Sequence, residues 1–80
     1  MIKMYSAEWC GPCKGMKALI AKEGLDVTVV DIGSLTGSEE ARGLGVQGVP
    51  MFYNTETKAT RIGSISLGQL KGFIDGVNIP

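Results

Sequence analysis

The sequence has no histidine, only two cysteines and no excess of either charge, because eight Lys and Arg side chains balance eight Asp and Glu. A zinc site normally has four nitrogen or sulfur ligands, so two cysteines do not complete one, and no metal or other cofactor is expected. The lack of a basic run argues against nucleic acid or an anionic membrane as the main partner. No apolar run approaches the roughly 18 residues that cross a bilayer.

A chain of 80 residues fits one domain, residues 1–80, near the lower limit of size for a self-supporting core. A first strand that begins at Met1 and reaches the cysteines by residue 10 leaves no room for a cleavable signal peptide, so a cytoplasmic location is expected. In the cytoplasm a lone cysteine pair is more often catalytic than structural.

Both cysteines lie in one motif, residues 9–14, which reads Trp-Cys-Gly-Pro-Cys-Lys. Residues 1–6 are apolar and β-prone, and residues 15–22 carry apolar side chains at positions i, i+3 and i+4, so the motif joins a strand to a helix. The free N–H groups and partial positive charge of a helix N-terminus favour a thiolate over a thiol. The spacing favours a redox pair, with a structural disulfide or half of a zinc site as alternatives.

The next elements follow from short β-prone and polar segments. Val27–Val30, ending at Asp31, is expected to be a buried strand. A loop at 33–37 leads to a short helix at 38–44, which Ser38 can cap. After these we expect a strand at 51–53, a hairpin connection at 54–58, a returning strand at 59–62 and a turn at 63–66.

A last helix over residues 67–77, capped by Ser66, completes the chain, since its apolar residues share one face. Those residues are Leu67, Leu70, Phe73, Ile74 and Val77. The element order is then β-α-β-α-β-β-α. A helix between the first two strands favours a parallel, right-handed crossover, and the last two strands form a hairpin. The sequence therefore predicts an α/β domain with a four-stranded mixed sheet and helices on both faces.

Three blocks of the sequence resemble the thioredoxin family. Residues 7–14 match its active-site signature, residues 45–50 (Gly-Val-Gln-Gly-Val-Pro) look like its segment before a cis-proline, and residues 63–74 are similar to its last turn and helix. The resemblance spans most of the chain and implies a minimal thioredoxin-like fold. The N-terminal strand and helix of typical thioredoxins have no counterpart here, which leaves the size of a glutaredoxin or other small redoxin.

Two positions depart from the family pattern. Thioredoxins usually carry a buried Asp six residues before the first cysteine, where this sequence has Met4, and a partner lysine whose place falls near Val29. Both Met4 and Val29 are expected in the core. Without the Asp, Cys13 would need another proton acceptor, such as water.

The resemblance implies a role for each residue of the motif. The thiolate, not the thiol, attacks a disulfide sulfur. Cys10 is expected to be the nucleophile, because the residue before the first helical turn stays exposed. Cys13 would then resolve the mixed disulfide and release the reduced substrate. Gly11 and Pro12 would hold the two sulfurs close, and proline suits the first turn because it has no N–H to leave unpaired.

Trp9 and Lys14 flank the pair. Trp9 is expected to cover the disulfide and shape a docking surface, the alternative being an ordinary half-buried tryptophan. Lys14 either raises the local positive potential, which lowers the pKa of a thiol, or is a solvated lysine on a helix.

Pro50 is expected, from the resemblance, to follow a cis peptide bond, against the general preference of X–Pro bonds for trans. The alternative is a trans proline at a strand edge. A cis Pro50 facing the cysteines would leave the backbone of Val49 free to pair with an extended substrate segment. Gly63 and Ser64 would form the third side of this apolar groove, or else a plain turn.

The expected activity is the reduction of protein disulfides by a monomeric thiol–disulfide oxidoreductase, recharged by a thioredoxin reductase-like electron donor. A glutaredoxin-like enzyme recharged by glutathione ranks lower, since residues 63–66 lack the acidic turn that holds the glutathione amine. Ribonucleotide reductase is an acceptor for many small redoxins, but nothing in the sequence selects it. The remaining alternative is a non-catalytic interaction subunit that grips a partner with the same groove.

Overall fold

The computed structural model describes residues 1–76. Within this range the elements are β1 (Ile2–Ser6), α1 (Gly11–Glu23), β2 (Val27–Asp31), α2 (Leu35–Leu44), β3 (Met51–Asn54), β4 (Thr60–Ile62) and α3 (Leu67–Ile74). The strands form one sheet in the order β2-β1-β3-β4. β1 and β2 run parallel, whereas β3 is antiparallel to both β1 and β4. The predicted element order and mixed sheet are confirmed.

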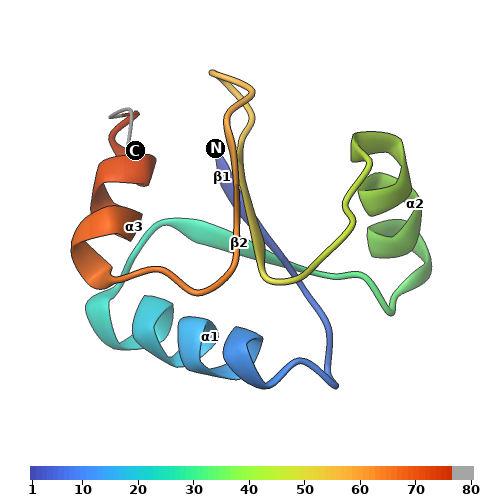
Figure 1. The fold of residues 1–80 in the computed structure, drawn as a ribbon, viewed down its shortest axis with the longest axis horizontal. Coiled ribbons are helices and arrows are strands. Elements are labelled where there is room, and N and C mark those ends of the chain that lie inside the picture. The colour runs from blue at the N-terminus through green and yellow to red at the C-terminus, as the bar shows by residue number, and fades with distance from the viewer. Residues whose placement is uncertain (77–80) are drawn as a thin grey trace.

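The three helices lie on both faces of the sheet: α1 and α3 cover one face and α2 covers the other (Figure 1). Successive side chains of a strand point to opposite faces, so β1 contributes to two cores. Ile2 and Met4 pack towards α1 and α3, and Tyr5 packs with Ala41 of α2. The main cluster comprises Ile2, Met4, Met16, Ile20, Phe52, Ile65, Leu70 and Phe73.

β2 is an edge strand, which corrects the expectation of a buried one. Thr28 and Val29 are exposed, Val29 to 40%. In the described sheet β2 has a neighbour on one side only, so its side chains are flanked by other strands on that side alone. Met4, the register partner of Val29 on the central strand β1, is fully buried as expected. Val29 therefore does not belong to the core.

α2 begins at Leu35 rather than Ser38, and Ser34 rather than Ser38 caps it. The Ser34 hydroxyl accepts the N–H of Gly37 at 3.0 Å. Gly37 lies inside the helix instead of in a loop. Only glycine fits at this position, because a β-carbon there would collide with the backbone oxygen of Asp31. Glycine at this position lets α2 pack directly against the end of β2.

α3 begins as expected, with Ser66 as its cap. The Ser66 hydroxyl accepts the N–H of Gln69, and the Gln69 side chain accepts the N–H of Ser66, which completes a capping box. The helix ends at Ile74, and Val77 lies outside the described residues. The other residues of the expected apolar face are buried or half-buried: Leu67, Leu70, Phe73 and Ile74.

A polar network connects β1 to α2 on the second face of the sheet. The Tyr5 hydroxyl donates to Glu40 Oε1 at 2.9 Å, and Lys3 Nζ forms an ion pair with the same oxygen. The hydrogen bonds from Lys3 and Tyr5 hold the pKa of Glu40 below its usual value. Burial, together with the bond to Glu40, raises the pKa of Tyr5 well above its usual value. At neutral pH the network therefore joins a carboxylate to a neutral phenol.

Candidate active site

The turn between β1 and α1 positions the two cysteines. β1 ends at Ser6, and the carbonyl of Ala7 then accepts the N–H of Cys10 at 3.1 Å. Cys10 is the N-cap of α1, with an extended backbone, and its sulfur accepts the N–H of Cys13 at 3.2 Å. Pro12 stands in the first turn, where its missing N–H would have no helical partner. The expectation that the motif joins a strand to the beginning of a helix is confirmed, with Cys10 at the cap and Cys13 in the first turn.

Cys10 and Cys13 form a disulfide, with their Cα atoms 5.3 Å apart. Cys13 has no exposed area, and Cys10 is 4% exposed. The expectation that Cys10 stays exposed is therefore wrong, because Ile32 and Val49 pack against the pair. Only a small part of Cys10 therefore reaches solvent.

One further loop meets Cys10, and a second loop meets the first. The carbonyl oxygen of Val49 lies 3.7 Å from the Cys10 sulfur, and the Val49–Pro50 peptide bond is cis. The N–H of Gly63 donates to the carbonyl of Pro50 at 2.8 Å. Gly63 has a φ of 98°, a conformation that favours glycine. The structure thus brings together Val49, Pro50 and Gly63, which the sequence analysis placed in one groove, and Ser64 follows as an exposed residue.

The Trp9 side chain is 79% exposed, so the alternative of an ordinary half-buried tryptophan is wrong. Trp9 precedes the helix cap, and its ring lies on the side of the loop between β2 and α2. There it lines an open pocket of about 270 Å³ next to the cysteine motif. The pocket residues are Ala7, Glu8, Trp9, Asp31, Gly33 and Ser34.

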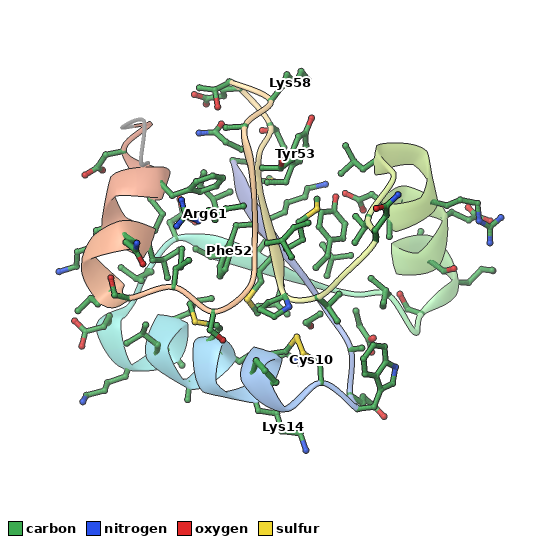
Figure 2. The ribbon with its side chains drawn as sticks, viewed as in Figure 1. Cys10, Lys14, Phe52, Tyr53, Lys58 and Arg61 are labelled. Atoms are coloured by element: carbon green, nitrogen blue, oxygen red, sulfur yellow. A yellow bond between two sulfur atoms is a disulfide. The ribbon has the colours of Figure 1, made fainter. Side chains whose placement is uncertain are left out.

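Gly11, Pro12 and Lys14 lie on the solvent side of α1. The Lys14 side chain points away from the sheet and from the disulfide (Figure 2). Of the two sequence hypotheses for Lys14, the structure favours the solvated lysine. The stabilisation of a thiolate then depends on the free N–H groups of the helix N-terminus.

Two parts of this region were not predicted from the sequence. The first is the far side of the pocket, where Asp31 Oδ1 accepts the N–H of Gly33 at 2.8 Å. An Asp-x-Gly segment before a serine cap is a local signal that could have indicated this turn. The second is Ser6, whose hydroxyl is buried without a hydrogen-bond partner among the described residues. A single serine at the end of a strand gives no sequence signal of that kind.

The described part of the chain contains neither a candidate metal site nor a candidate membrane-spanning helix. Across residues 1–76, no three His, Cys, Asp or Glu side chains are grouped so that they could hold a metal ion. In the same range, no helix has both the length and the apolar character needed to cross a membrane.

The family model for thioredoxin matches residues 1–76. The chain belongs to the thioredoxin family. The thioredoxin of Pseudomonas aeruginosa is 31% identical over 78 residues, which cover 89% of this chain and 72% of that protein. The thioredoxin of Rickettsia typhi is 37% identical over an alignment of 81 residues, which covers 92% of this chain and 74% of that protein. Together with the Cys10–Cys13 pair, these relationships identify a dithiol–disulfide oxidoreductase.

Solved structures agree on the fold of this thioredoxin-family chain. Oxidised thioredoxin O2 from Arabidopsis thaliana superposes with a TM-score of 0.65 at 24% sequence identity. The match covers 94% of this chain and 71% of the plant protein. The predicted thioredoxin-like fold is confirmed.

Proposed function

We propose that the protein reduces disulfide bonds of other proteins, with Cys10 as the nucleophile and Cys13 as the resolving cysteine. The observation that carries this proposal is the disulfide between the N-cap and the first turn of α1. In the dithiol form, the same helix N-terminus stabilises a thiolate. The small exposed edge of Cys10, against none for Cys13, supports this assignment of roles.

The exchange proceeds in two balanced steps. The Cys10 thiolate attacks one sulfur of the substrate disulfide, and the other substrate sulfur leaves as a thiolate. The Cys13 sulfur then attacks the Cys10 sulfur and breaks the mixed disulfide. The Cys10–Cys13 disulfide forms, and the second substrate sulfur leaves and takes up the proton that Cys13 gave up. The substrate gains two electrons, and the protein loses them.

A substrate segment docks on the surface around Cys10. Val49 is half-buried and its carbonyl lies beside the Cys10 sulfur, a position from which its backbone would pair with an extended substrate chain. The exposed ring of Trp9 and its neighbouring pocket add an amphipathic contact on the other side. The proposed docking surface comprises Trp9, Gly11, Pro12, Val49, Gly63 and Ser64. Pro50, which the sequence also assigned to this surface, is fully buried and contributes by positioning Val49 and Gly63.

The oxidised protein has to be recharged with two electrons after each cycle. We assign this to a thioredoxin reductase-like donor, with glutathione as the second candidate. The proposal also includes action as a monomer in the cytoplasm, where thiols are kept reduced.

An assay of protein-disulfide reduction tests the proposal. The protein is supplied with electrons either by NADPH and a thioredoxin reductase or by a glutathione system. We expect turnover with the reductase, none for Cys10→Ser, and a trapped covalent complex with substrate for Cys13→Ser. If a Cys10→Ser/Cys13→Ser variant kept the protein's function, the function would depend on binding a partner and not on thiol exchange, which would favour the non-catalytic interaction subunit.

The ionisation of Cys10 provides an independent check. Thiolate absorbance in the Cys13→Ser variant should show a thiol that ionises well below the free-cysteine pKa of about 8.5. A Cys10 thiol with an ordinary pKa would contradict the role given to the helix N-terminus.

A further inference from the structure

Ser6 is a buried polar residue that the proposed reaction does not yet use. Its side chain has no exposed area, and its hydroxyl has no hydrogen-bond partner among residues 1–76. Its backbone carbonyl does have one, since it accepts the N–H of Ile32 at 2.9 Å. Buried hydroxyls are almost always hydrogen-bonded, because leaving one unpaired is unfavourable. The unpaired hydroxyl therefore calls for an explanation at this position.

The packing of β1 against α1 shows what Ser6 faces. Side chains two residues apart on a strand share a face, and those three or four apart on a helix do the same. Ile2 and Met4 of β1 belong to the same core cluster as Met16 and Ile20 of α1, so the side-chain stripes of the two elements oppose each other. Taken in matching order, the stripes are Ile2, Met4 and Ser6 on β1, and Ile20, Met16 and Cys13 on α1.

The last members of the two stripes are Ser6 and Cys13. A step of two residues along a strand spans about 6.6 Å, and a step of three along a helix about 4.5 Å, so one further step offsets the two stripes by only about 2 Å. The tight turn from Ala7 to Cys10 keeps the beginning of α1 against the end of β1. Ser6 therefore faces the same buried end of α1 as the sulfur of Cys13.

We propose that the Ser6 hydroxyl donates a hydrogen bond to the Cys13 sulfur when the disulfide is open. In the disulfide the bond to Cys10 fixes the position of the Cys13 sulfur, and the Ser6 hydroxyl has no partner among the described residues. Once the disulfide opens, the Cys13 sulfur is free to move, and when it ionises for the attack on Cys10 the thiolate is a strong acceptor. Ser6 is thus a positioning residue for the resolving step, and this inference rests on the roles proposed above for the two cysteines.

Ser6 acts without losing its own proton. The proton of the Cys13 thiol goes to the departing substrate sulfur, and the Ser6 O–H stabilises the thiolate during the attack. The site has Met4 where a carboxylate would be expected in this family, so a neutral donor is the group available on this strand. A hydroxyl lowers the pKa of a buried thiol without adding a second buried charge.

Two measurable effects follow. A bond that exists only in the dithiol form stabilises that form relative to the disulfide. At a pH at which Cys13 is ionised in the dithiol form, Ser6→Ala should therefore shift the equilibrium with a dithiothreitol redox buffer about tenfold towards the disulfide, which is about 30 mV for a two-electron couple. Ser6→Thr keeps the hydroxyl and should stay near the wild-type equilibrium.

The second effect is on the acidity of Cys13. In a Cys10→Ser background, thiolate absorbance reports Cys13 alone, and adding Ser6→Ala should raise its pKa by about one unit. Ser66→Ala is the matched control, because it removes a hydroxyl that caps α3 away from the cysteines. That control should lower stability but leave both the redox equilibrium and the Cys13 pKa unchanged.

The inference is overturned if Ser6→Ala leaves the equilibrium and the Cys13 pKa where they were, or moves either in the opposite direction. Ser6→Ala removes one atom and creates no clash, so the variant is expected to fold. Neither measurement uses a protein substrate or a reductase. A failure here is therefore distinct from a failure of the proposed protein-disulfide reduction, which the turnover assay detects.

Discussion

Replacing Gly37 by alanine should destabilise the protein, although alanine is the better helix former. A β-carbon at position 37 would collide with the backbone oxygen of Asp31 and come within 2.7 Å of the Ser34 hydroxyl. Those two atoms hold each other, since the Ser34 hydroxyl donates to the Asp31 carbonyl at 2.8 Å. Because neither is the far end of a flexible side chain, α2 has to move away from the end of β2.

The size of the effect follows from three contributions. Overpacking of this kind costs about 1–3 kcal/mol, and loss of the Ser34 cap adds about 1 kcal/mol. The better helix propensity of alanine returns about 1 kcal/mol. The expected net loss in the free energy of unfolding is thus about 1–3 kcal/mol, and each kcal/mol lowers the melting temperature of a domain this size by about 4–8 °C.

Urea unfolding followed by circular dichroism measures this loss, with Gly43→Ala as the matched control. Gly43 lies in the same helix, and a β-carbon there would meet no atom within 4 Å. Gly43→Ala should therefore gain up to about 1 kcal/mol from helix propensity alone. If both variants gained stability, or both lost it equally, the close packing of α2 against Asp31 would not be the reason for glycine at position 37.

Four further substitutions have defined outcomes. Glu40→Gln should lower the free energy of unfolding at neutral pH by about 0.5–1 kcal/mol. The pKa of Glu40 is below its ordinary 4.5 in the folded state, so its contribution is complete above that value and is lost as the pH falls through the folded pKa. Urea titrations between pH 2 and 7 should thus show a shallower acid dependence in the variant. Val29→Thr should change stability by less than about 0.5 kcal/mol, whereas Met4→Ala should cost about 2–5 kcal/mol; thermal unfolding that ranked them equally would contradict the edge position of β2. Ser66→Ala should cost about 1 kcal/mol in the same measurement, and an unchanged midpoint would argue against the capping box.

The features that could be predicted from the sequence depend on neighbouring residues. A β-prone segment, Pro12 and an apolar stripe with helical spacing place Cys10 and Cys13 at the beginning of a helix. The cap of α3 is local in the same sense, since Ser66 and Gln69 satisfy each other within one turn. Such contacts need no knowledge of which strands become neighbours.

The features that could not be predicted depend on contacts distant in the chain. A run of β-branched residues is typical of a buried strand, but Val29 is exposed because β2 is at the edge of the described sheet. Gly37 resembles a loop residue in the sequence, and only its contact with Asp31 explains why a helix has glycine at this position. Trp9 likewise turns towards the loop after β2, which no local pattern indicates.

Ser6 shows the same limit at the site itself. The departure at Met4 predicts that the resolving cysteine needs another partner, but not which residue provides it. The candidate becomes visible only when β1 and α1 are aligned, because the two residues belong to different elements.

The sulfur of Cys10 has two tasks, since it is both the proposed nucleophile and the atom that accepts the N–H of Cys13 in the first turn of α1. The same sulfur atom therefore serves both the proposed attack on a disulfide and the capping of α1. A Cys10→Ala variant would lose both together, at a structural cost of about 1 kcal/mol for the missing cap, and its inactivity would not report on the nucleophile alone. Cys10→Ser retains an oxygen that can cap α1, so this variant should lose thiol–disulfide exchange while the beginning of the helix stays in place.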